Sequence, residues 1–393
     1  MKEIDTDILI VGAGLVGLVA AHSLSLLKYN VVIVDKKDLN DPKSSPKDIR
    51  TVAVSQGSKQ FLENIFLWNG IKESAEAIKI IKVFDRDQSN KIIFENFKKE
   101  KKLGYVIENS KFSKSLLISL KKKKNVKIFY GSELTKIDQK NTFAKTYFKN
   151  YIINSKLIIA ADGKHSSVRK IVGNKILTKN YPESALVLNF FHENNLNNTA
   201  YEIFSNTGPL AILPMKFSNK FFQSSIIWSN KNSFINKIIN CNNEFIANIV
   251  YEKVGMITGN IIKINSKQKF PISAHINDSF FSKRLIYIGD SAHSIHPIAG
   301  QGWNLGIKDI KNLNLVFNDY ILKKQEIGND IFCKEYNSLS YKNAFQLFQI
   351  TDKLDSHFKR KENLYRFLSN TGINFIESSE KIKNKITEYA MGF

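Results

Sequence analysis

A glycine pattern near the start of the chain, Gly-x-Gly-x-x-Gly, constrains the fold more than any other feature of the sequence. It follows residues 7–11, a fully apolar run that predicts a buried parallel strand. Residues 15–27 then predict a helix, and residues 31–34 predict a second buried strand. A strand, a glycine turn, a helix and a strand within about 30 residues predict the first βαβ unit of an α/β fold.

Each glycine of this loop has a chemical reason. Gly12 permits the tight turn, Gly14 lets the backbone approach a pyrophosphate, and Gly17 lets the helix pack closely on the strand. The free N–H groups of the helix favour an anion, and Asp35 ends the second strand, where an acid binds a ribose hydroxyl. The pattern predicts a dinucleotide site; the loop by itself fits FAD and NAD, and a purely structural glycine turn is the alternative.

Two further acids follow buried strands. Residues 157–161 and 285–288 are apolar runs, and each ends in a pair of glycine and aspartate. Because ligands of open α/β sheets bind beyond the carboxyl ends of the strands, we expect these acids to face the same ligand. An ordinary turn is the alternative for the first pair. The two pairs are Asp162-Gly163 and Gly289-Asp290.

The second pair leads into a loop that contains Pro297, Gly300 and Gly302 and opens a helix. Such glycines let a flat ligand approach backbone N–H groups, and the helix N-terminus stabilises negative charge on a bound ring. His293 and His296 lie three residues apart and suggest a metal pair. No third ligand lies nearby in the sequence, so we expect no metal site.

Together and in this order, these motifs resemble the class A flavoprotein monooxygenases. The stretch 290–306 is similar to the signature of the ubiquinone-biosynthesis hydroxylase branch of that family. Residues 50–55, 104–109, 207–214 and the ending 390–393 support the resemblance, which spans nearly the whole chain. Trp303 and Lys308 stand where Leu and Arg are usual, and the middle region diverges.

The resemblance implies an α/β fold with a Rossmann-like FAD-binding domain of the p-hydroxybenzoate-hydroxylase type, a mixed β-sheet substrate domain and C-terminal helices. The expected boundaries are 1–75, 101–175 and 275–340 for the FAD-binding domain, 76–100 and 176–274 for the substrate domain, and 341–393 for the helical segment. Residues 185–270 are expected to be rich in strands.

The resemblance also implies an activity. NADH or NADPH reduces FAD, O2 forms a flavin C4a-hydroperoxide, and one oxygen atom passes to the ring of a polyprenylated phenol. The residues expected to hold FAD are Gly12, Gly14, Gly17, Asp35, Arg50, Asp162, Gly163, Gly289, Asp290, Pro297, Gly300, Gln301, Gly302 and Asn304. No catalytic side chain is identified. The candidate bases are His293, His296, Tyr201 and Tyr287, for each of which packing or a local hydrogen bond is the alternative.

The charge of the chain bears on its partners. There are 58 Lys and Arg residues against 36 Asp and Glu, a formal net charge of +22, and nearly all the basic residues are Lys. Nucleic-acid readers favour Arg and carry recognition motifs that are missing here, so no nucleic-acid partner is expected. The excess of Lys is explained by compositional bias or by attraction to an anionic membrane surface. The apolar residues 8–27 are explained by the strand, the turn and the helix, and not by a transmembrane segment. We therefore expect a cytoplasmic protein that is peripheral on the inner face of the membrane.

Other functions fit the same motifs. A non-catalytic or partner-dependent flavoprotein subunit of a quinone-biosynthesis complex would keep the glycines and acids. A hydroxylase of a small soluble aromatic acid would need an Arg in the middle region, and residues 176–275 contain none, although Lys could replace it. A flavin reductase or halogenase is a further alternative. The two cysteines lie far apart and fit no disulfide scaffold or redox motif.

Overall fold

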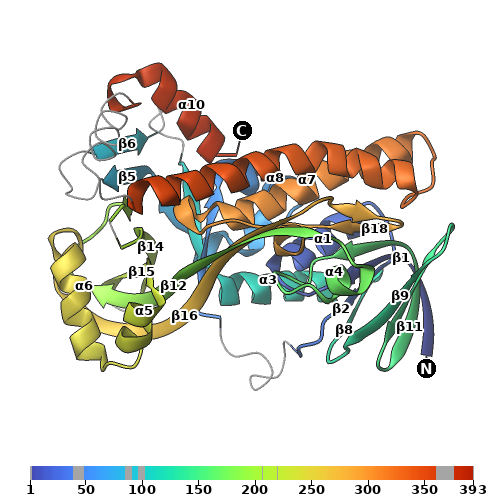
Figure 1. The fold of residues 1–393 in the computed structure, drawn as a ribbon, viewed down its shortest axis with the longest axis horizontal. Helices are drawn as coiled ribbons and strands as arrows, with labels where there is room; N and C mark the ends of the chain where they lie inside the picture. Colours follow the sequence, from blue (N-terminus) through green and yellow to red (C-terminus); the bar gives the residue numbers. More distant parts are fainter. Residues whose placement is uncertain are drawn as a thin grey trace.

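The computed structural model describes residues 2–38, 48–84, 91–95, 102–205, 207–218, 220–359 and 376–392. Two large β-sheets form the frame, and two strands of 17 residues, β12 (Ile176–His192) and β16 (Ile261–Asn277), run from one half of the molecule to the other. Figure 1 shows these long strands crossing between the end that carries the N-terminus and the end that carries α5 and α6.

The first sheet has a parallel centre in the order β18-β11-β1-β2-β8, with antiparallel β17 at one edge. All of β2 and the last four residues of β1 and of β11 are buried on both faces, and the sequences there are continuously apolar. Strands β9 and β10 extend it from β11. The strands are β1 (Lys2–Val11), β2 (Val31–Val34), β8 (Val126–Phe129), β9 (Leu134–Gln139), β10 (Ala144–Phe148), β11 (Tyr151–Ala160), β17 (Phe281–Ser282) and β18 (Leu285–Tyr287).

Helix α1 (Leu15–Leu26) packs against α3 (Asn109–Lys121) and α7 (Gln301–Leu322), and these helices cover the first sheet. The short helix α4 (Ser167–Val172) follows β11, and a 3-10 turn, η3 (Gly289–Ser291), follows β18. A fully buried core joins the sheet to these helices.

The second sheet has the order β19-β16-β12-β15-β14-β13-β5-β6. Side chains alternate along its strands: Leu186, Ile212 and Ile226 face a core beneath α5 (Asn232–Ile238) and α6 (Asn243–Thr258), whereas their neighbours face the opposite way. The remaining strands are β5 (Ile80–Phe84), β6 (Lys91–Glu95), β13 (Thr199–Ile203), β14 (Leu210–Ser218), β15 (Phe221–Lys231) and β19 (His293–Ser294).

A three-stranded sheet lies between the two halves, in the order β3 (Thr51–Ser55), β7 (Gly104–Glu108) and β4 (Glu76–Ile78). Helix α2 (Gln56–Asn64) and two 3-10 turns, η1 (Trp68–Gly70) and η2 (Lys72–Ser74), separate its strands along the chain. Strands β4 and β7 contact β14, so the small sheet joins the first half to the second.

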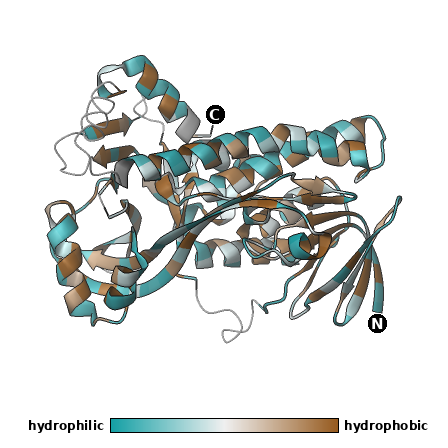
Figure 2. Cartoon of the chain, viewed as in Figure 1, coloured by the Kyte–Doolittle hydropathy of each residue, from teal (hydrophilic) through white to brown (hydrophobic). Residues whose placement is uncertain are grey.

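The chain ends in helices. The 30-residue helix α8 (Asp330–Lys359) packs on α7 and crosses the molecule, and α10 (Glu380–Ala390) follows the gap in the described residues (Figure 1). Hydrophobic and hydrophilic residues alternate along α8 in Figure 2, as expected of an amphipathic helix with one face on the core. No helix among the described residues is both long and apolar enough to cross a bilayer.

The structure refines several sequence expectations. The strand expected at residues 157–161 is longer in the structure, where β11 begins at Tyr151 and ends at Ala160. The region 185–270 is not made of strands alone, because it also contains α5 and α6. In α6 the apolar residues Ile246, Val250 and Val254 recur every four positions, a helical spacing. The domain boundaries stay a prediction; β16 continues through the 274–275 junction.

Replacement of Phe317 by Ala tests the helical layer. The Phe317 ring is fully buried and meets Tyr29 and Phe332 edge-on, with ring centroids 5.1 and 5.0 Å away. The cavity left by this change should lower the free energy of unfolding by about 3–5 kcal/mol. Urea denaturation measures it. Leu322→Ala, at an 82% exposed position of the same helix, should change stability by about 0.5 kcal/mol or less; equal effects would contradict the packing.

Candidate flavin site

The glycine loop sits in contact with the backbone of a neighbouring strand end. Gly12 has φ +110°, and a Cβ there would lie 2.4 Å from the carbonyl oxygen of Ala161. A Cβ on Gly17 would lie 2.1 Å from the carbonyl oxygen of Gly12. No side chain fits at either position, so α1 and the carboxyl ends of β1 and β11 are held together by backbone contact.

Gly14 has a different role, because a Cβ there would meet nothing within 4 Å. It is the N-cap of α1, and no side chain caps this helix end. Its N–H groups are therefore available to an anion that approaches along the open side of Gly14. Asp35 lies beside the loop: its Oδ2 accepts a hydrogen bond of 2.7 Å from the backbone N–H of Ala13, and Oδ1 accepts one from Lys37.

Two adjoining cavities, of about 900 and 970 Å³, open in front of this loop. Both are lined by Gly14, Arg50, Asp290 and Pro297, so the sequence motifs converge on one space. Cavities of this size lie at the upper end of the usual range for cofactor and ligand sites. The other expected residues that line one or both of them are Gly12, Asp35, Asp162, Gly163, Gly300 and Gly302.

Asp162 lies at the carboxyl end of β11. Its Oδ2 accepts hydrogen bonds from the backbone N–H groups of Ser167 (2.7 Å) and Val168 (3.1 Å), at the start of α4. Its Oδ1 is buried and has no hydrogen-bond partner among the described residues. Burial raises the pKa of Asp162 against the effect of these hydrogen bonds. The free oxygen is an acceptor that a ligand hydroxyl could satisfy.

Arg50 enters the cavity beside β3. Its Nε and Nη2 donate to the two carboxylate oxygens of Asp48 at 2.9 and 2.8 Å, and its guanidinium lies 5.0 Å from the ring centroid of Phe270. The two hydrogen bonds to Asp48 orient the guanidinium group of Arg50 and raise the pKa of Arg50. Burial opposes ionisation of Asp48, but the hydrogen bonds and charge of Arg50 lower the pKa of that carboxyl.

Asp290 follows β18 and is open to the cavities, although protein atoms surround it on the other sides. The loss of bulk water raises the pKa of Asp290, while the positive charges of His293, Arg50 and Lys164 pull it down. The carboxylate therefore faces a ligand with positive side chains around it. Such a site can accept a hydroxyl of a phosphorylated ligand without repelling its phosphates.

The loop 297–302 ends at the N-terminus of α7, whose N-cap Gly300 lies in the left-handed region and carries no side-chain cap. Asn304 anchors this turn to β3: its Oδ1 accepts from the backbone N–H of Ser55 at 2.9 Å, and its Nδ2 donates to the carbonyl of Ala53 at 2.8 Å. Asn304 and Gln301 line a separate small cavity behind the turn. They hold the turn from behind and do not line the two large cavities.

Asp309 is a site residue that sequence reasoning missed. Its Oδ2 accepts hydrogen bonds from the backbone N–H of Gly289 (2.8 Å) and from His293 Nε2 (2.7 Å), and all three residues are buried. Burial disfavours the charged ring of His293, but the attraction of Asp309 prevails and raises its pKa. Asp309 lies one helical turn after Gly306, the last residue of the motif, and this spacing is the signal that could have found it.

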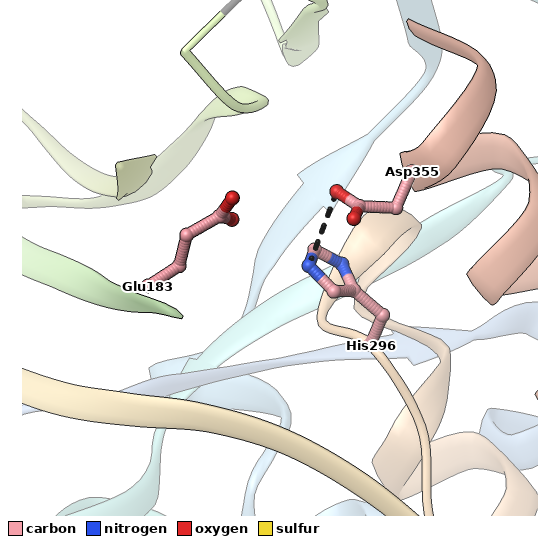
Figure 3. Close-up of side chains that lie close together, drawn as sticks. All are labelled: Glu183, His296 and Asp355. Carbon is pink, nitrogen blue, oxygen red and sulfur yellow. Dashed lines mark ion pairs between the residues drawn. The ribbon is translucent and has the colours of Figure 1, made fainter. Parts of the chain in front are cut away.

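His296 does not share partners with His293. Its Nε2 lies 3.3 Å from an oxygen of Asp355 on α8, and Glu183 of β12 completes a buried group (Figure 3). Their ligand atoms lie within 4.8 Å of one another, so the fold supplies two acids that the sequence did not place beside this histidine. The group ties α8 to the loop that begins at Pro297. The expectation of no metal stays a prediction.

The tyrosine candidates lie away from the cavities. Tyr201 stacks against Phe84, with ring centroids 6.4 Å apart, on the face of the second sheet that carries α5 and α6. Tyr287 is fully buried in the core of the first half, and burial raises its pKa. Neither residue lines the large cavities, and the same holds for His293 and His296.

These features fit FAD. An uncapped helix with open Gly14 suits a pyrophosphate, the buried free oxygen of Asp162 suits a hydroxyl, and the uncapped N-terminus of α7 suits a flat ring that gains negative charge. The individual contacts of FAD with the expected residues stay predictions.

The two glycines make a matched test of the loop. Gly17→Ala places a methyl group on backbone, so it should lower the stability of the FAD-free protein by about 1–3 kcal/mol. Gly14→Ala should leave that stability unchanged but weaken FAD binding about tenfold, or about 1.4 kcal/mol. Thermal unfolding of the apoprotein and FAD titration by fluorescence separate the two effects. Equal loss of stability in both variants would contradict the assignment.

Asp290→Ala tests the carboxylate in the cavity. The variant loses a charged hydrogen-bond acceptor worth about 1.5–3 kcal/mol, so it should bind FAD about ten- to a hundredfold more weakly. Flavin content after purification and titration of the apoprotein measure the loss. Asp138→Ala, which removes a partly exposed carboxyl that pairs with Lys136 and does not line the cavities, is the control. An Asp290→Ala protein that keeps its yellow colour and its activity would sink the predicted role.

Comparisons with known proteins agree with this geometry. The chain is 26% identical over 391 residues to ubiquinone hydroxylase UbiL of Rhodospirillum rubrum, covering 98% of this chain and 89% of that protein. It is 24% identical to 3-demethoxyubiquinol 3-hydroxylase of Escherichia coli, with all of both chains covered. The crystal structure of p-nitrophenol 4-monooxygenase from Pseudomonas putida superposes with a TM-score of 0.78, covering 100% of this chain and 99% of that one at 16% identity, which supports the fold.

A family model described as FAD binding domain matches residues 5–320. That match includes every glycine and acid of the cavity described above and both sheets, except for the first three residues of β1. The chain therefore belongs to this FAD-binding family, among the class A FAD-dependent monooxygenases.

Proposed function

We propose that the protein hydroxylates the aromatic ring of a polyprenylated phenol in ubiquinone biosynthesis, with NADH or NADPH and O2 as co-substrates. The observation that carries the proposal is similarity over nearly the full chain to ubiquinone-pathway hydroxylases, joined to a cavity that fits FAD on one side and an apolar ligand on the other.

The apolar side of the cavity comes from the second sheet. Val187, Leu213 and Ile227 line the cavities, and they face away from the core under α5 and α6. Pro297 and Gly302 line the same space from the opposite half. A flat aromatic ring would lie between the two halves, shielded from bulk water by both.

FAD supplies the reductive activation of O2, which is chemistry that amino-acid side chains cannot perform. The side chains of this protein bind and orient. Arg50 and Lys164 bring positive charge to the cavity beside Asp290, and the N-terminus of α7 faces it from the loop side. Asn304 and Asp309 on α7 accept hydrogen bonds from the backbone N–H groups of Ser55 and Gly289, and these bonds hold the start of α7 beside β3 and the end of β18.

The proposal favours a long apolar substrate over a small aromatic acid. A small acid needs a cation for its carboxylate, and no Arg occurs in residues 176–275, which include most of the second sheet. The cavity-facing residues of β12, β14 and β15 named above are aliphatic. The membrane surface and a quinone-biosynthesis complex stay predictions as partners; the net charge of +22 supports attraction to an anionic surface.

Turnover of a defined phenol tests the function. The purified protein with FAD is mixed anaerobically with NADH or NADPH, and O2 and a short-chain prenylated phenol are then added. Bleaching and recovery of the flavin spectrum, with one added oxygen atom in the product by mass spectrometry, are the expected result. Reduction without hydroxylation of any prenylated phenol, with hydrogen peroxide as the product, would contradict the proposal and favour a partner-dependent subunit.

A further inference from the structure

We propose that Glu202 is the side chain that hydrogen-bonds the phenolic hydroxyl of the substrate and accepts its proton. The inference rests on the proposed function and assigns a base to a reaction for which the sequence identified none. It follows from the register of the second sheet, which places the buried Glu202 carboxyl on the same sheet face as residues that line the apolar side of the cavity.

The register determines which way Glu202 faces. In antiparallel sheets, directly paired residues point to the same face. Glu202 pairs with Ala211, Ala211 pairs with Ile227, and Ile227 pairs with Val187. Ile227 and Val187 line the cavities. Glu202 therefore belongs to the cavity-facing row, whereas its neighbour Tyr201 belongs to the opposite face.

Leu213 brings the row closer to the cavity. It lies two residues after Ala211 on β14, on the same face, and it lines the larger cavity. It is thus a diagonal neighbour of Glu202, at a separation of about 7–8 Å that a long side chain can bridge. A substrate ring against Leu213 and Ile227 would lie within reach of the Glu202 carboxyl.

The surroundings of Glu202 are apolar. Ala200 precedes it by two residues on the same face and forms a cluster with Met215, Ile78 and Met391, and partly buried Leu213 packs against that cluster. Glu202 itself is 9% exposed. A carboxyl in such a place is costly to ionise and needs a reason to be there. A hydroxyl of the ligand supplies one, because it can donate a hydrogen bond to the carboxylate.

Burial raises the pKa of Glu202 to about 8. Charged groups on the packed elements are Lys82 on β5, which lies over the Tyr201 ring on the other face, Lys216 on β14, and Glu76 on β4. A carboxylate with its usual pKa of about 4.3 is too weak a base for a phenol, whose pKa is about 10. The raised pKa of Glu202 makes the difference between the pKa values of the carboxyl and the phenol smaller, so proton transfer becomes feasible in the complex.

The proton balance is simple. The O–H bond of the phenol breaks and an Oε–H bond of Glu202 forms, which leaves a phenolate with a more electron-rich ring. The base must be ionised to act. Therefore kcat/KM should rise with pH, with a midpoint near 8, as Glu202 loses its own proton.

The experiment compares Glu202→Gln with Glu76→Gln, both as FAD-loaded proteins. Glu76 is a half-buried carboxyl on β4 that bonds Asn198, so it matches the charge change outside the cavity-facing row. Glu202→Gln should lower kcat/KM at high pH by about a hundredfold and remove its rise with pH. Glu76→Gln should keep the wild-type profile. Glu202→Asp, which keeps a titrating group, should restore part of the rise.

Absorption spectra of a bound phenol give a readout that a structural role would not move. Above pH 8 the hydrogen bond to the ionised Glu202 carboxylate should shift the absorption band of the bound phenol to longer wavelength, and Glu202→Gln should lose most of that shift. An unchanged pH profile or an unchanged band shift in Glu202→Gln would overturn the inference, and so would loss of FAD from all Glu202 variants. Failure of the proposed function is separate: the wild-type protein itself would then hydroxylate no prenylated phenol.

Discussion

The backbone contact between the ends of β1 and β11 is the constraint on which the rest of the molecule depends. Gly12 touches Ala161 where no side chain fits, and Gly17 touches Gly12 in turn. The N–H of Gly12 also bonds the carbonyl of Val34, and Ala161 bonds Val11. These contacts bring the glycine loop, Asp35 and Asp162 to one edge of a parallel sheet, where they line the same cavity.

The second half of the site depends on alternation in the antiparallel sheet. One face of β12, β14 and β15 is buried under α5 and α6, so the other face is left to border the cavity. The buried group of Glu183, His296 and Asp355 joins this sheet, the loop before α7 and the long helix α8 (Figure 3). The second sheet, the loop before α7 and α8 therefore meet at this group.

Much of the first half could be predicted. Continuous apolar runs gave β2, β18 and the buried parts of β1 and β11, and strand-end acids marked the cavity edge, because local sequence reports burial on both faces of a parallel strand. Helix α6 was missed because its apolar spacing lies among strands rich in aromatic residues. Asp309 and the partners of His296 were missed because their contacts join distant segments of the chain.

The sequence alone determined the dinucleotide loop, the two strand-end acids, the order of the motifs and, through their resemblance to a known family, the class of chemistry. Those features are short patterns whose residue types are needed for local backbone geometry and for charge. Only the tertiary structure decided which face of each strand borders the cavity and that Tyr201 and Glu202 lie on opposite faces of β13. The physical reason is register: a shift of one residue exchanges the two faces of a strand, and register is set by pairing with strands distant in the sequence.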